Sequence, residues 1–152
     1  MKLQWAENSV KCLCWIGLVA IDDGHTDTAF FVADNMMSVA KSAAAKIKNI
    51  ATRELADLLV PMRMMVYLAG EIGYDYVVKQ LEVSEAKLIS ELPAHGDLKL
   101  ILHKYASERI NEIVRGRYPL YDPADPQTVM LQILRRRMQK SDQSGETTAS
   151  GE

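Results

Sequence analysis

The chain has 152 residues, enough for one domain that buries roughly two-thirds of the surface its unfolded form would expose. Its composition, 48% hydrophobic and 25% charged, is ordinary for a globular protein and argues against extensive disorder and against a bilayer-spanning chain. The formal net charge of -2 excludes a global positive field that would draw the chain onto nucleic acid or an anionic membrane, so such binding would need a local patch.

The first apolar run, Cys12–Ala20, superficially resembles the hydrophobic region of a secretory signal. However, Glu7 interrupts the basic region before it, Asp22 and Asp23 follow it, and a run of this length is too short to span a bilayer. We therefore expect no membrane partner and a cytoplasmic location.

The only two cysteines lie within this run, at Cys12 and Cys14. On a helix, side chains two positions apart point about 200° away from each other, which prevents a disulfide between them. We predict that both are reduced, buried, small apolar residues without a redox or metal-binding role.

Residues 5–40 predict an N-terminal αα-hairpin. Apolar residues crowd one broad helical face from Trp5 to Ile21, the Asp22-Asp23-Gly24 sequence supplies a turn, and Thr26 is a suitable N-cap for a second helix that reaches about Ala40.

This hairpin resembles a single tetratricopeptide-type unit. Gly17, Gly24 and Ala29 fall at the spacing where that repeat keeps small residues for close helix contact. No second copy follows in register, and an array needs several stacked units to form a continuous core.

The middle of the chain predicts further helices. Residues 41–50 have high helix propensity and few large apolar side chains, which indicates an exposed helix or connector. An amphipathic helix over 52–60 is expected to end or kink at Pro61, and another over 62–72 to end near Gly73. Its methionines are typical of gap-filling core residues, and an adaptable binding surface is the alternative.

The C-terminal part begins with the clearest amphipathic helix, over 98–114. A proline-rich connection follows, and Asp125 as N-cap with Pro126 at the first helical position predicts a last helix over 127–140. Residues 141–152 contain no large apolar side chain, so we expect a flexible tail.

These patterns together predict an all-α protein. The expected architecture is a multi-helix bundle in one domain over 1–140, with the N-terminal αα-hairpin at 5–40, a helical core at 52–140 and a disordered C-terminal tail at 141–152. No stretch of the sequence shows the regular alternation of a strand.

The stretch 74–92 predicts two short helices, 74–81 and 84–92, around a tight turn. Its Leu81-Glu82-Val83-Ser84 string resembles the helix-turn-helix of many bacterial DNA-binding regulators, in which the first helix ends in Leu-x-Val-Ser. The string and the long helix after it also resemble the FlhD-type subunit of the flagellar master regulator. The expected interior of the motif consists of Val77, Val78, Leu81, Val83 and Leu88.

The resemblance implies that Ser84 caps the second helix and that Lys87 and Ser90 lie near its DNA-facing side. The sequence departs from the family in three respects: Glu82 stands where the turn glycine is usual, Leu92 falls one residue late for the closing apolar position, and Lys87 is the only cation on the second helix. Phosphate contacts would therefore have to come from elsewhere in the chain.

The candidates for phosphate contacts are five arginines in the C-terminal third: Arg115, Arg117, Arg135, Arg136 and Arg137. Cations of this kind can fix phosphates while another helix reads the bases. They can equally favour the dipole at the end of a helix and keep that end soluble.

Catalysis has little support in the sequence. His25, His95 and His103 are far apart and match no metal-ligand spacing, and there is neither a phosphate-binding loop nor a nucleophile elbow. We predict a protein that is not an enzyme and uses no metal or cofactor.

Two functions remain. The first is a DNA-binding transcriptional regulator that acts as a homodimer, since one copy of the motif would bind weakly. The alternative is a helical adaptor or chaperone that binds a partner protein in an apolar groove between the N-terminal hairpin and the methionine-rich helix over 62–68.

Overall fold

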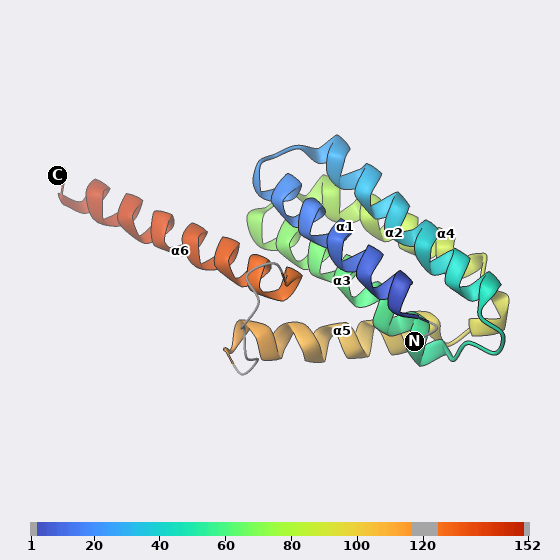
Figure 1. Cartoon of the computed structure of the whole chain (residues 1–152). Coiled ribbons are helices and arrows are strands. Elements are labelled where there is room, and N and C mark those ends of the chain that lie inside the picture. The colour runs from blue at the N-terminus through green and yellow to red at the C-terminus, as the bar shows by residue number, and fades with distance from the viewer. Residues whose placement is uncertain (1–2, 117–124, 151–152) are drawn as a thin grey trace.

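The computed structural model describes residues 3–116 and 125–150, with side chains for 3–116 and 125–140. These ranges form an all-α multi-helix bundle without a strand (Figure 1). The helices are α1 (Gln4–Asp22), α2 (Thr26–Lys46), α3 (Thr52–Ile72), α4 (Asp75–Ser90), α5 (Leu98–Val114) and α6 (Pro126–Ser150), with a short 3-10 turn, η1 (Pro93–His95). None of the helices described is long and apolar enough to cross a membrane.

The N-terminal αα-hairpin is confirmed: α1 and α2 pack side by side (Figure 1). The turn between them uses Gly24 at φ 77°, a left-handed conformation that glycine adopts without strain. Gly17 brings the helices close, because a Cβ atom there would lie 3.2 Å from Val32 Cγ1 of α2 and 2.6 Å from Met65 Cε of α3. The second helix is longer than predicted and ends at Lys46, so most of the expected 41–50 connector is part of α2.

The centre of the bundle is α3, which contacts each of the other α-helices. The predicted boundary at Pro61 is wrong, because α3 continues through it from Thr52 to Ile72. Buried side chains on both sides of the proline, including Leu59 and Met62, pack against neighbouring helices. Their burial offsets the roughly 3 kcal/mol that a proline costs inside a helix.

The predicted tight turn within 74–92 is also wrong, because Asp75–Ser90 is one uninterrupted helix, α4. Its buried residues, Val77, Leu81, Glu85 and Leu88, follow the spacing of a single helical stripe that packs on α2 and α3. Val83, expected in the interior, is 57% exposed. A helix-former, Glu82, at the place of the turn glycine lets the helix continue.

The C-terminal helices begin as predicted. The helix expected over 98–114 is α5, and α6 starts at Pro126 with the backbone N–H of Gln127 donating to Asp125 Oδ1 at 2.9 Å. The far end of α6 lies away from the other helices (Figure 1). Residues 141–150, predicted as a tail, are thus outside the bundle and have a helical backbone to Ser150.

Candidate functional site

Part of the outward side of α1 carries large apolar side chains, although the opposite side of the same helix forms part of the core. The side chains on this outward face, here called the α1 outer strip, are Trp5, Asn8, Cys12, Trp15, Ile16 and Val19. Trp5, Trp15 and Ile16 are 42%, 45% and 42% exposed. The exposure of these three large apolar side chains on one face shows that no element of the described chain covers this part of α1.

A groove runs beside the strip, between α1 and the first residues of α6. Its volume is about 520 Å³. It is lined by Asn8, Lys11, Cys12, Trp15, Ile16, Asp125 and Pro126, and we call it the α1–α6 groove. Most of this lining is apolar, and the charged residues at its edge have opposite signs, so the groove has no strong preference for ligand charge.

Trp5 is held at one end of the strip by a cation–π contact. Lys46 Nζ at the end of α2 lies 5.7 Å from the centroid of the Trp5 ring. The contact orients the indole while leaving much of it exposed. A rigid aromatic side chain with two torsions loses little entropy on binding, which suits Trp5 and Trp15 to an interface.

The two cysteines differ, contrary to the prediction that both are buried: Cys14 is buried and Cys12 is exposed on the strip. Burial and, to a lesser extent, the negative charge of Asp125 raise the pKa of the Cys14 thiol well above its usual range. The Cys14 thiol also donates a hydrogen bond to the carbonyl oxygen of Pro61 at 3.3 Å. Cys14 therefore stays protonated and unreactive near neutral pH.

A thiol-labelling experiment tests this difference. An exposed thiol reacts readily with a maleimide at about pH 7.5. At this pH we expect the reagent to modify the folded protein once, at Cys12. Mass spectrometry should find Cys12→Ser unlabelled until denaturant is added and Cys14→Ser labelled once. Rapid double labelling of the folded protein would contradict the assigned burial.

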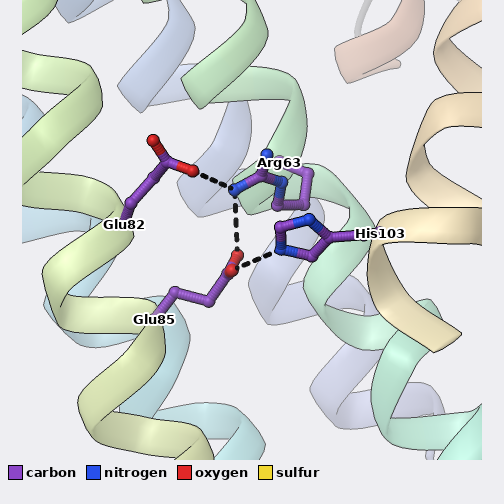
Figure 2. A network of polar contacts seen from close by, with 4 residues as sticks. All are labelled: Arg63, Glu82, Glu85 and His103. Atoms are coloured by element: carbon purple, nitrogen blue, oxygen red, sulfur yellow. Dashed lines mark hydrogen bonds and ion pairs between the residues drawn. The ribbon is translucent and has the colours of Figure 1, made fainter. Parts of the chain in front are cut away.

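A buried carboxylate joins three helices on another part of the bundle (Figure 2). Glu85 of α4 is 3% exposed. Its Oε1 lies 3.0 Å from His103 Nε2 of α5, and its Oε2 accepts from Arg63 Nη1 of α3 at 3.4 Å. Arg63 also donates to the more exposed Glu82 at 3.4 Å. The network ties α3, α4 and α5 together by compensating a charge that would be costly to bury alone.

This network was not predicted from the sequence. The available signal was the spacing Leu81, Glu85, Leu88, which places Glu85 on the buried stripe. In the part of the chain described, no group of three or more His, Cys, Asp or Glu side chains could hold a metal ion.

The predicted DNA-binding residues Ser84, Lys87 and Ser90 lie on the continuous helix α4 and not on a separate recognition helix. Ser84 lies in the middle of the helix, where it cannot act as an N-cap, and is half-buried. Lys87 and Ser90 are exposed near the C-terminal end, where the Ser90 hydroxyl donates to the carbonyl oxygen of Lys87 at 2.7 Å. The neighbouring Glu91 forms a 2.7 Å ion pair with Lys41 of α2.

The predicted phosphate-binding arginines lie elsewhere. Arg115 is exposed at the end of α5, Arg135 is exposed on α6, and Arg117 lies outside the described residues. Both Arg136 and Arg137 pair with Asp22 at the end of α1, with Arg137 Nε at 2.8 Å from Asp22 Oδ1. The two ion pairs hold α6 against the hairpin. They also compensate the negative charge of Asp22, which is unfavourable at the C-terminal end of a helix.

The predicted DNA-binding residues at the end of α4 and the predicted phosphate-binding arginines of α6 lie near opposite ends of α3. Lys41–Glu91 and the 2.8 Å contact between Thr52 and His95 place the end of α4 near the start of α3. Arg135 lies near Glu71, at the other end of α3. These ends are about 28 Å apart along the helix. The structure therefore brings together Arg135, Arg136 and Arg137 but not the residues of α4.

The groove predicted between the hairpin and the methionine-rich helix is filled. Met62, Met64 and Met65 are each no more than 1% exposed, and Met65 packs directly against Gly17. These methionines are core residues, as their gap-filling interpretation predicted. The hairpin does present accessible apolar side chains, but on the outward side of α1.

Comparisons with known proteins give no significant match to a family model, to a curated protein or to a solved structure.

Proposed function

We propose that the protein is a helical interaction module, an adaptor or chaperone, that binds an amphipathic helix of a partner protein on the α1 outer strip and in the α1–α6 groove. The observation that carries this proposal is the exposure of Trp5, Trp15 and Ile16 on the solvent side of a helix whose other side is core. Exposed aromatic side chains grouped beside a groove are typical of binding hot spots.

The dimensions of the strip favour a helix as the bound element. From Trp5 to Val19 it is about 21 Å long, which matches a partner helix of about four turns. Such a helix can place apolar side chains three and four positions apart along the strip, as in other helix-in-groove complexes. Since the strip itself carries no charge, hydrophobic contact supplies the affinity and salt has little effect.

The same features argue against DNA as the ligand. The strip has no cation for phosphates, Arg136 and Arg137 already pair with Asp22, and the uninterrupted α4 provides no separate recognition helix. A DNA-binding regulator remains the competing function that the experiment has to separate.

The proposal is tested with Trp15→Ser and the control Phe31→Ser, which removes a 69% exposed aromatic side chain from α2. A partner is first identified by photo-crosslinking from a reagent attached to Cys12, and its affinity for purified wild-type and variant proteins is then measured by calorimetry. We expect Trp15→Ser to weaken binding about 30-fold or more, as loss of a hot-spot tryptophan does, and Phe31→Ser to leave it unchanged.

Two outcomes would overturn the proposal. One is a partner whose affinity is equal for Trp15→Ser and wild type. The other is duplex DNA binding that falls steeply between about 50 and 200 mM salt and does not depend on Trp15, which would support the regulator. Equal thermal unfolding of both variants and the wild type would show that the comparison reports binding alone.

A further inference from the structure

A second groove lies between the ends of α3 and α5 and the middle of α6. Its volume is about 470 Å³. It is lined by Tyr67, Glu71, Ile72, Val114, Leu131, Leu134, Arg135, Arg137 and Met138, and we call it the α3–α6 groove. Met138 and Val114 are 67% and 43% exposed, so apolar surface continues to its mouth. None of its residues belongs to the α1 outer strip.

The charged side chains around this groove differ in whether they are free to bind a ligand. Arg135 is exposed and makes no ion pair with any residue that the structure describes. The opposing acid, Glu71, interacts with the Tyr67 hydroxyl: burial, the Glu71 charge and a hydrogen bond to Glu71 together raise the pKa of Tyr67. Two arginines and one acid, the exposed Glu71, line the groove. Arg137 pairs with Asp22, so Arg135 is the arginine that can meet a ligand carboxylate.

We propose that the α3–α6 groove is a second docking site, for an acidic amphipathic helix of a partner protein. Apolar side chains of that helix contact Leu134 and Met138, and a flanking aspartate or glutamate pairs with Arg135. Charge complementarity supplies selectivity, and the apolar floor supplies most of the affinity. The proposal concerns a surface separate from the α1 outer strip and stands without it.

The apolar side chains that line the groove favour a protein over a nucleic acid as the ligand. DNA contacts are dominated by cations that meet phosphates, and burial of aliphatic side chains adds little to them. Here one available arginine stands beside exposed Met138 and Val114. An element with both carboxylates and apolar side chains satisfies both features of the groove.

The test uses two fluorescent helical peptides of about 16 residues, long enough to span the groove. Both carry leucines at helical spacing, and they differ only in flanking glutamates or flanking lysines. Fluorescence anisotropy near 0.15 M salt is expected to show about tenfold tighter binding of the glutamate peptide to the full chain. Arg135→Glu and Met138→Ser should each weaken the glutamate peptide about tenfold.

Matched controls lie at the far end of α5. Lys99→Glu reverses an exposed charge and Leu100→Ser removes a 76% exposed apolar side chain, and both should leave peptide affinity unchanged. All peptide affinities are compared in the Trp15→Ser background, because the α1 outer strip is itself proposed to bind an amphipathic helix. Failure at the α3–α6 groove is then distinguishable from failure at the strip. Equal binding of the two peptides, or equal effects of controls and groove variants, would overturn the proposal. So would DNA binding lost in Arg135→Glu but retained in Met138→Ser.

Discussion

Gly17→Leu is expected to lower the free energy of unfolding by about 3 kcal/mol or more, at the upper end for overpacked cores. Even a Cβ atom at this position would lie 2.6 Å from Met65 Cε and 3.2 Å from Val32 Cγ1. Met65 is fully buried, so its side chain can move away only if neighbouring core side chains move with it. Urea unfolding followed by circular dichroism measures the change.

Two further variants identify steric crowding as the cause. Gly17→Ala alone should still destabilise the protein, despite a gain of roughly 1 kcal/mol in helix propensity. Combining it with Met65→Val should recover part of the loss. Gly96→Ala is the control, because an added Cβ there meets nothing within 4 Å. Wild-type stability of Gly17→Leu would contradict the close approach of α1, α2 and α3.

Arg63→Met is expected to destabilise the protein by about 3 kcal/mol, because removing one partner of a buried ion pair leaves a charge without compensation. Glu85, at 3% exposure, would keep only His103 as a partner. Thermal and chemical unfolding both measure this loss. The effect should exceed that of any exposed ion pair in the described chain.

The buried and exposed pairs provide an internal comparison. Lys41→Met removes the ion-pair partner of Glu91, whose pKa is lowered by a hydrogen bond from Lys41 and by the positive charge of Lys41. Because this pair is at the surface, the free energy of unfolding should not change measurably. Adding Glu85→Leu to Arg63→Met should recover much of the lost stability, since no buried charge then remains. Equal stability of Arg63→Met and wild type would refute the role assigned to this network.

Local sequence signals were sufficient where they acted within one helix. The apolar periodicity over 98–114 gave the bounds of α5, and Asp125 with Pro126 gave the start of α6. The small residue Gly17, the turn at Gly24 and the length of the apolar face predicted the hairpin. These features depend on neighbours a few positions apart, so their physical causes are present in the sequence itself.

Local signals failed where packing between helices outweighed them. Pro61 was expected to end or kink a helix, but burial of its flanking residues keeps α3 continuous. The Leu-x-Val-Ser string indicated a turn, but Val77, Leu81, Glu85 and Leu88 pack as one stripe and keep α4 intact. In both cases long-range contacts decided between two conformations that the local sequence permits.

The candidate surfaces depended on tertiary structure even more strongly. The continuous apolar run Cys12–Ala20 contains more apolar residues than one helix face needs, which indicates a second apolar face besides the one in the core. The run does not show which of the two faces packs in the core and which faces solvent. The two arginines that pair with Asp22 lie 114 and 115 positions away from it. By itself, the sequence determined an all-α bundle with an N-terminal hairpin, because helix formation and hairpin turns follow from local periodicity and backbone preferences. Only the tertiary structure decided that Trp15 is exposed, Glu85 is buried and Arg136 is paired, because burial and ion pairing depend on which distant helix lies opposite each side chain.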